Sequence, residues 1–166
     1  MLMVLYSGLM QKKGDVYRSC AAIVVLRKTA QGHEVLLLHK PRKRDAWQLP
    51  QGGRESGESL EQAAERELME EAGIRVRLLG RTSTVYQYDF PASYRRFRPD
   101  NVCGQRVEFV FAVMDQPKAV QVDAHEIDAY VWVHPSKIHM YIRRKQYLGV
   151  VRRIVQEAIA LLPQAA

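Results

Sequence analysis

The stretch "WQLPQGGRESGESLEQAAERELMEEAGI", residues 47–74, decides how this chain folds. It contains seven glutamates and four glycines, and its cations are Arg54 and Arg66. The 166-residue chain carries a formal net charge of +7, so this acidic stretch stands out in an otherwise basic protein. A concentration of carboxylates in a basic chain needs a physical reason, and the spacing of those carboxylates suggests one.

The second half of the stretch is predicted to form an α-helix. Ser59 is suited to cap the first turn, and Gln62, three residues later, completes a capping box. Gly73 is suited to end the helix, because glycine adopts the left-handed conformation without steric cost. At about 100° per residue, this helix carries an apolar stripe formed by Leu60, Ala64, Leu68 and Ala72.

Three glutamates border that stripe instead of lying opposite it. Glu67 and Glu71, four residues apart, share one face of the helix, and Glu70 lies beside them. One alternative is a solvated acidic face with no further role. However, partial burial makes uncompensated negative charge costly, and Arg66 cannot neutralise three carboxylates. A divalent cation resolves the problem: oxygen ligands favour Mg²⁺, with Mn²⁺ as a substitute, which indicates metal-assisted hydrolysis of a phosphate compound.

Outward from this stretch, strand-like and loop-like segments alternate. Apolar runs predict strands at 19–28, 34–40, 75–90, 105–115 and 129–135, and apolar spacing predicts a last helix at 143–162. Loops are predicted at 42–53, where Pro50 and Gly52 disfavour regular structure, and at 91–104. Strands with one helix between them and one helix at the end predict a mixed sheet that is covered on both faces.

Length and composition indicate one globular domain over residues 1–166, with 47% hydrophobic and 26% charged residues. Residues 1–9 are treated as a flexible or mis-assigned start, because Met10 is an alternative first residue. The terminus lacks the charge order of a secretory signal, and no apolar run approaches the roughly 18 residues of a membrane span. Cys20 and Cys103 have no metal-binding spacing, which favours reduced thiols in a cytoplasmic protein.

The pattern that begins at Gly52 resembles the Nudix box. Gly52 is followed after five residues by Glu58, and after seven more by "RELMEEAGI" at 66–74, so every defined position of the box is matched. The resemblance implies an α/β fold, the α/β/α sandwich with a mixed sheet that is typical of Nudix proteins. It also implies a hydrolase that cleaves a phosphoanhydride bond in a nucleoside diphosphate linked to another group.

The same resemblance implies a role for each charged residue of the box. The metal ligands would be Glu67, Glu70, Glu71 and the carbonyl of Gly52. Arg66 would orient the glutamates, and Glu58 would belong to the network that supports them. The negative charge would then hold cations, and the basic remainder of the chain would receive phosphates.

Segments outside the box resemble the bacterial RNA pyrophosphohydrolases and the related dinucleoside polyphosphate hydrolases. The similar segments are "WQLPQGG", "YQYDFP", "VCGQRVEF", "HEIDAYVWV" and "VRRIV", which together run along most of the chain. The chain departs from that branch at Ser19 and Cys20, and at Val131 between two aromatic residues. Details of base contacts are therefore not transferred to this chain.

Basic and aromatic residues supply the candidates for substrate binding. Cations near the first strands are placed to reach a phosphate tail, and aromatic rings interleaved with arginines suit the stacking of bases. The plain alternatives are solvated surface charge for the cations and core packing for the rings. The candidates are Arg18, Arg42, Lys43, Tyr86, Tyr88, Arg95, Arg96 and Arg143. Lys40 flanks the same strands, and the cluster Arg143-Arg144-Lys145 either extends an RNA path or is the exposed start of the last helix.

Glu126, in "HEIDAYVWV", lies outside the box and just before a predicted strand. Its place resembles that of a fourth acidic residue, which in this branch helps to bind metal or activates water. A carboxylate near a cation can act as a general base where geometry allows. The alternative is an ordinary surface glutamate.

We therefore expect a cytoplasmic, Mg²⁺-dependent pyrophosphohydrolase that removes pyrophosphate from the 5′-triphosphate end of RNA. Hydrolysis of diadenosine polyphosphates is the close alternative, because these compounds present the same phosphate chain and a base that can stack. A third hypothesis is a non-catalytic Nudix module that binds a nucleotide or RNA. The intact set of box glutamates disfavours this third hypothesis.

Overall fold

The computed structural model describes residues 3–6, 14–41, 46–96 and 101–163. Its elements are β1 (Met3–Tyr6), β2 (Val16–Thr29), β3 (Gly32–His39), β4 (Trp47–Gln48), β5 (Gln51–Gly53), α1 (Leu60–Ala72), β6 (Arg77–Asp89), α2 (Ala92–Arg95), β7 (Val102–Val113), β8 (Ala129–Val133), the 3₁₀ helix η1 (Pro135–Met140) and α3 (Lys145–Ala160).

The strands of the described residues form one mixed sheet. Its order is β1-β6-β7-β2-β3-β4, with β5 pairing to β2 and β8 pairing to β3. The pairs β1–β6 and β2–β7 are parallel, whereas β6–β7, β2–β3, β2–β5 and β3–β8 are antiparallel. The mixed sheet predicted from the sequence is therefore confirmed.

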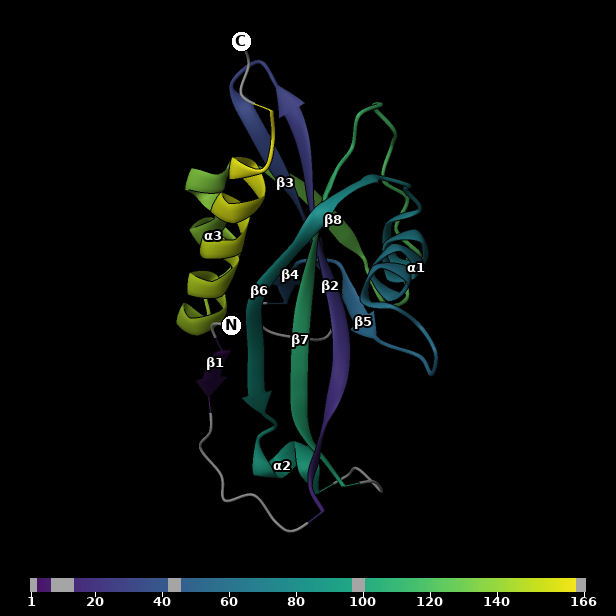
Figure 1. Ribbon diagram of the computed structural model, residues 1–166, viewed down its shortest axis with the longest axis vertical. Helices are drawn as coiled ribbons and strands as arrows, with labels where there is room; N and C mark the ends of the chain where they lie inside the picture. The colour runs from purple at the N-terminus through teal and green to yellow at the C-terminus, as the bar shows by residue number, and fades with distance from the viewer. Residues whose placement is uncertain (1–2, 7–13, 42–45, 97–100, 164–166) are drawn as a thin grey trace.

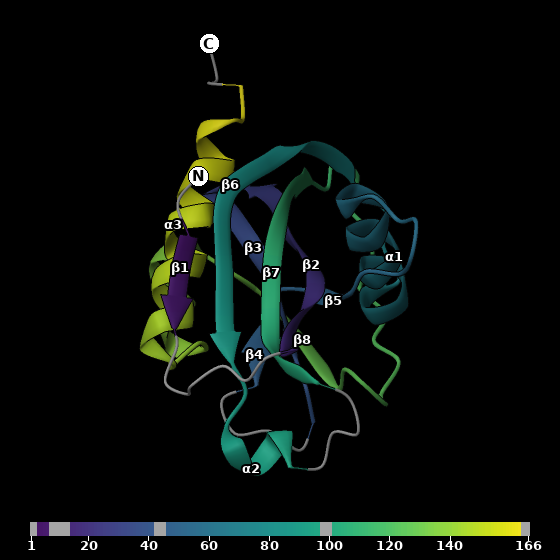
Figure 2. The ribbon, with the colours of Figure 1, turned by 60° about the horizontal axis from the view of Figure 1, so that its bottom comes forward.

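The two long helices cover opposite faces of this sheet, with α1 on one side and α3 on the other in both views (Figures 1 and 2). Strand β2 shows why, because its consecutive side chains point to alternate faces. Ala21, Ile23 and Val25 pack with the buried residues of α1, whereas Ala22 and Val24 pack with those of α3. The continuous apolar run of β2 thus reflects a strand that is buried on both faces, in an α/β/α sandwich.

Helix α1 forms as its sequence predicts. The Ser59 hydroxyl accepts from the backbone N of Gln62 at 3.0 Å, and the Gln62 side chain accepts from the backbone N of Ser59 at 2.9 Å. Gly73 ends the helix in the left-handed region, with φ 66°. The predicted stripe is confirmed as buried; Leu68, for example, is 1% exposed, and burying such a side chain contributes about 2 kcal/mol.

The prediction of a loop over 42–53 is wrong in part. Trp47–Gln48 pairs with β3, and Gln51–Gly53 pairs with β2 in the register Ala21↔Gly52 and Cys20↔Gly53. Local sequence disfavours strand at two adjacent glycines, but hydrogen bonding to a strand about thirty residues earlier overrides it here. This pairing fixes the backbone of Gly52 beside α1.

Other boundaries also differ from the sequence-based ones. The loop predicted at 91–104 contains the short helix α2 and the beginning of β7. The last helix begins at Lys145 and is preceded by η1. Within residues 1–9, Met3–Tyr6 forms β1, which pairs with β6 from Val85 to Tyr88. None of the helices in the described ranges has both the length and the apolar run that a bilayer span requires.

Candidate active site

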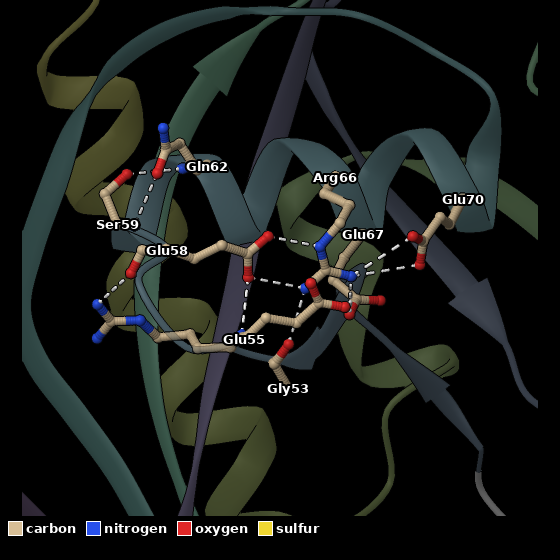
Figure 3. A network of polar contacts seen from close by, with 9 residues as sticks. Gly53, Glu55, Glu58, Ser59, Gln62, Arg66, Glu67 and Glu70 are labelled. Atoms are coloured by element: carbon tan, nitrogen blue, oxygen red, sulfur yellow. Dashed lines mark hydrogen bonds and ion pairs between the residues drawn. The ribbon is translucent and has the colours of Figure 1, made fainter.

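Arg66 stands at the centre of the acidic network (Figure 3). Its Nε donates to Oε1 of Glu58 at 2.6 Å, and its Nη2 donates to Oε2 of Glu58 at 3.0 Å. Nη2 also donates to the carbonyl of Gly53 at 2.9 Å. These three bonds link α1 to the residue before its N-cap and to the end of β5, so the guanidinium has one defined orientation.

The remaining nitrogen of Arg66 faces two glutamates of the helix. Nη1 donates to Oε1 of Glu67 at 2.9 Å, and it lies 3.4 Å from Oε2 of Glu70. Figure 3 shows the guanidinium between Glu58 on one side and Glu67 and Glu70 on the other. The hydrogen bonds that Arg66 donates to Glu58, and then to Glu67, raise the pKa of Arg66 above its usual range. One permanent cation therefore orients three carboxylates.

Glu58 is itself held by the turn that precedes the helix. Its Oε2 accepts from the backbone N of Glu55 at 2.8 Å, and its carbonyl accepts from Nη2 of Arg54 at 3.0 Å. The hydrogen bond from Arg66 and then that from the Glu55 backbone lower the pKa of Glu58 to about 2. Glu58 is thus ionised throughout the physiological range, which keeps its pair with Arg66 intact.

Glu67 and Glu71 are buried, with 9% and 2% of their surface exposed. Burial raises the pKa of both carboxyl groups, in the case of Glu71 to about 8, because charge is poorly solvated there. Oε2 of Glu71 accepts from the backbone N of Gln51 at 3.2 Å. Among the described residues, no donor reaches Oε1 of Glu71. The site therefore contains a buried carboxylate oxygen that lacks a partner.

The glycines of β5 allow two charged side chains to approach the backbone. A Cβ at Gly52 would collide with the carboxylate of Glu67, and a Cβ at Gly53 would collide with the guanidinium of Arg18. Any larger residue at either position would displace the charged side chain, so the glycines here allow a close approach and do not serve a turn. Arg18, from β2, consequently lies next to the backbone that borders the acidic residues.

Glu126 lies in the exposed segment before β8. Burial is the main cause of the raised pKa values of Glu67 and Glu71, and the negative charge of Glu126 adds to the effect on both. Glu126 is therefore near Glu67 and Glu71 in the folded chain, although it lies more than fifty residues later in the sequence than these two glutamates.

The donor set fits a hard divalent cation. Glu67, Glu70 and Glu71 present carboxylate oxygens, which Mg²⁺ prefers, and the unpartnered oxygen of Glu71 needs a positive neighbour. Within the described ranges, the acidic side chains do not form a group of three that already surrounds one point. Glu67 and Glu70 accept from Arg66 instead, while Glu71 accepts from Gln51. Cation binding therefore requires small rotations of side chains that Arg66 now holds.

A cavity of about 460 Å³ lies beside the acidic site on the side of the sheet that α3 covers. Five aromatic side chains contribute to its walls, and the ring centroids of Tyr86 and Tyr88 lie 5.1 Å apart. Arg144 lies over the ring of Tyr147 at 5.1 Å, at the beginning of α3. The residues that line it include Lys40, Gln48, Gln51, Tyr86, Tyr88, Phe90, Tyr94, Gln105, Arg144 and Tyr147.

Some of the residues predicted to bind substrate line the cavity, and others do not. Tyr86 and Tyr88 line the cavity, and burial raises the pKa of Tyr88 to about 12. Arg95 forms an ion pair with Asp15 at 2.7 Å. Arg96 and Arg143 are both exposed to solvent. Arg42 and Lys43, the remaining two candidates, lie outside the described residues.

Sequence reasoning named Lys40 and Arg144 as basic residues that could contact phosphates, but it missed Gln51, which also lines the cavity. Lys40 directly follows an apolar strand, where its side chain emerges at the end of the sheet, and Arg144 precedes the last helix. Gln51 carried no signal, because its importance comes from its backbone bond to Glu71.

Comparisons with known proteins agree with this geometry. The NUDIX domain family matches residues 16–154. The RNA pyrophosphohydrolase of Sulfurovum sp. (strain NBC37-1) is 30% identical over 158 residues, which covers 90% of this chain and 99% of that protein. The RNA pyrophosphohydrolase of Francisella tularensis subsp. mediasiatica (strain FSC147) is 33% identical over 141 residues, with 79% and 88% covered. The solved C. elegans Ap4A hydrolase binary complex is similar in fold, with a TM-score of 0.69 at 22% identity over 86% of this chain and 98% of that one.

Proposed function

Because this chain belongs to the Nudix family, whose hydrolases act on pyrophosphate bonds, we propose that it removes pyrophosphate from the 5′-triphosphate end of RNA. The family membership and the hydrolysis of phosphoanhydride bonds are the premise. The choice of RNA, the metal and the role of each residue are the proposal.

The observation that carries the proposal is the contact between the aromatic cavity and the acidic site. Gln51 lines the cavity and donates its backbone N–H to Glu71. Lys40 also lines the cavity, and its positive charge lowers the pKa of Glu71 against the larger effect of burial. A base between the aromatic rings would therefore place its 5′-phosphates next to the carboxylates.

Two further observations favour RNA over a free nucleotide. The similar proteins named RNA pyrophosphohydrolase match this chain over most of its length. In addition, exposed cations lie outside the cavity: Arg96 follows α2, and Arg143 and Lys145 flank the N-terminus of α3. A polynucleotide extends beyond the base in the cavity and can contact such cations through its phosphates.

Under this proposal Glu67, Glu70 and Glu71 would hold Mg²⁺, with Glu126 and the carbonyl of Gly52 as further oxygen donors. The bound cation would supply positive charge for phosphate oxygens and lower the pKa of a nearby water. Mn²⁺ prefers similar ligands and would substitute for it.

The residues of the chain itself would then have separate roles in the reaction. Arg66 orients Glu67 and Glu70, while Arg18 and Lys40 neutralise phosphate oxygens of the substrate. Water attacks a phosphorus atom, the phosphoanhydride bond breaks and pyrophosphate leaves. A carboxylate oxygen of Glu126 accepts the proton that the water loses.

The close alternative is hydrolysis of diadenosine polyphosphates. A specific feature is consistent with it: the amide Nε2 of Gln48 in the cavity wall has no acceptor among the described residues. An adenine base could provide that acceptor without any extended backbone. Both substrates require the same phosphate chemistry, so the cations outside the cavity must distinguish them.

The test compares kcat/KM for 5′-triphosphorylated RNA and for diadenosine tetraphosphate in Mg²⁺. Arg18→Ala should slow both substrates, because both carry the reacting phosphate chain. A double variant, Arg96→Ala with Arg143→Ala, should slow RNA about 10-fold or more at low salt and leave the dinucleotide nearly unchanged.

The matched control is Lys28→Ala with Lys118→Ala, which removes the same charge from two exposed positions elsewhere. This control should leave both rates near those of the unmodified protein. If the double variant of Arg96 and Arg143 lost kcat/KM equally on both substrates, the result would favour the dinucleotide as the substrate. Failure of the unmodified protein to cleave either substrate would refute both proposals and leave only the family chemistry.

The proposed compartment is the cytoplasm. Cys20 and Cys103, both within the described ranges, are buried thiols outside any disulfide, as is usual in a reducing compartment. A substrate such as the 5′ end of RNA would be found in the same compartment.

A further inference from the structure

The segment that carries Glu126 is organised by one carboxylate. Oδ1 of Asp123 accepts three consecutive backbone N–H groups, from His125 at 3.0 Å, from Glu126 at 3.0 Å and from Ile127 at 3.1 Å. These hydrogen bonds, that from Ile127 first, lower the pKa of Asp123. The ionised side chain thus replaces the missing hydrogen-bond partners of a tight turn.

The turn also contains a strained residue. Ala124 has φ 64° and is the one non-glycine residue with positive φ in the described part of the chain. Residues other than glycine rarely adopt this backbone conformation, and it persists only where surrounding contacts impose it. Here the contacts are the bonds of Asp123 and the bond from the Ala124 N–H to the carbonyl of Ile127 at 2.9 Å.

Both ends of this turn are attached to the elements that build the site. Before it, the N–H of Gln121 donates to the carbonyl of Ala72, the last residue of α1, at 2.8 Å. After it, Ile127 is fully buried in the core beneath α1. Asp128 then donates its N–H to the carbonyl of His39 at 3.1 Å, and its carboxylate lies 2.6 Å from Nδ1 of the same histidine.

Glu126 therefore projects from a short turn whose two ends are fixed and whose middle depends on Asp123. Its own side chain is exposed, and the backbone bond from Gln121 to Ala72, the residue after Glu71, keeps the turn close to the acidic residues of α1. We propose that Asp123 is a positioning residue that holds Glu126 in place against the acidic face of α1. This inference rests on the proposed role of Glu126 in the reaction.

The experiment uses a double-mutant cycle in Asp123 and Glu126. Glu126→Gln should lower kcat about 100-fold or more, as expected for loss of a general base. Asp123→Ala should lower kcat about 10- to 100-fold, the range found when a residue that orients a ligand is removed. KM should change little, because the proposed role of Asp123 is to hold the turn and does not include contact with the substrate.

A residue that acts through Glu126 has no effect once Glu126 has lost its function. In the Glu126→Gln background, Asp123→Ala should therefore lower kcat no further. Asp123→Asn should recover most of the activity, because its amide oxygen can still accept the three N–H groups. Asp115→Ala is the matched control, since Asp115 forms an exposed ion pair with Arg77 outside this turn.

A second measurement needs no turnover. In metal-free protein, hydrogen exchange at the amides of His125, Glu126 and Ile127 should speed up in Asp123→Ala and remain slow in Asp123→Asn. Unchanged exchange in Asp123→Ala would overturn the proposed turn, whatever the kinetics.

The remaining outcomes are distinguishable. If Asp123→Ala keeps full kcat, or if its loss multiplies with that of Glu126→Gln, Asp123 does not act through Glu126 and the inference is wrong. If Glu126→Gln keeps full kcat, the role of Glu126 fails and this inference fails with it. If the unmodified protein does not cleave triphosphorylated RNA, the proposed substrate fails, and the same cycle on diadenosine tetraphosphate still decides the role of Asp123.

Discussion

Arg66 and Glu58 form a two-point hydrogen bond across eight residues of the chain, with Nε–Oε1 at 2.6 Å and Nη2–Oε2 at 3.0 Å. Because the same guanidinium contacts Glu67 and Glu70, this bond sets the position of both glutamates. We expect Glu58→Gln to lower kcat about 10-fold or more, since one charge-assisted bond is lost and Arg66 gains freedom.

Glu65→Gln is the control for this variant. Glu65 is an exposed glutamate on the same helix, so its substitution changes the net charge equally and should leave kcat unchanged. Equal kcat values for the Glu58→Gln and Glu65→Gln variants would show that Arg66 needs no support from Glu58.

The pair of Arg66 and Glu58 also predicts a pH dependence of stability. The pKa of Glu58 is lowered from its usual 4.5 to about 2, chiefly by the bond from Arg66. A carboxyl group whose pKa is lower in the folded state adds stability that is complete above the unfolded pKa. This stability is lost as the pH falls through the folded pKa. The difference in Tm between the unmodified protein and Glu58→Gln should therefore be constant above pH 4.5 and shrink toward pH 2; a difference that grows on acidification would contradict the pairing.

Substitution of Glu71 by Gln is predicted to lower activity without lowering the stability of the metal-free protein. Glu71 is 2% exposed, and Glu71→Gln removes a carboxyl group whose ionisation is disfavoured by burial, while keeping an oxygen for the Gln51 N–H. In metal-free protein we expect the Tm of Glu71→Gln to equal or exceed that of the unmodified protein. Millimolar Mg²⁺ should raise the Tm of the unmodified protein but not that of Glu71→Gln, because a ligand of the folded state stabilises it by mass action.

Turnover of the Glu71→Gln variant should fall about 100-fold or more, since a proposed metal ligand is lost. The Glu65→Gln variant should retain both the rate and the rise in Tm with Mg²⁺. The assignment of Glu71 as a ligand would be wrong if the Glu71→Gln variant were stabilised by Mg²⁺ as much as the unmodified protein.

The close approach of Glu67 to Gly52 predicts that one added methyl group at this position lowers activity. A Cβ at this position would overlap the carboxylate of Glu67, so Gly52→Ala must displace that side chain or the backbone of β5. We expect kcat to fall about 10-fold or more and the stabilisation by Mg²⁺ to weaken, because Glu67 can no longer lie against β5.

Gly149→Ala is the matched control for Gly52→Ala. Gly149 is exposed in α3, and nothing lies within 4 Å of the Cβ that it would gain. Alanine there should stabilise the protein by about 0.5–1 kcal/mol through helix propensity and leave kcat unchanged. Wild-type activity in Gly52→Ala would rule out a close approach of Glu67 to Gly52 during the reaction.

The amino-acid sequence by itself determined helix α1 and the family. Ser59, Gln62 and Gly73 specify the ends of the helix through contacts within a few residues, and the apolar stripe specifies its buried face. Such local interactions are encoded by spacing alone, so they can be read without a structure. The mixed sheet between two helical layers was likewise predictable, from the order of strands and helices.

Tertiary structure decided which of the other residues meet. β5 exists because Gln51–Gly53 pairs with β2, Arg95 is paired with Asp15, and the cavity joins Lys40 to Arg144. The bond from the Leu49 N–H to the Tyr147 hydroxyl at 3.0 Å spans 98 residues and attaches α3 to the segment before β5. Contacts over such separations depend on how the whole sheet is ordered and twisted. No spacing along the chain encodes them, which is why the acidic helix could be predicted and the cavity beside it could not.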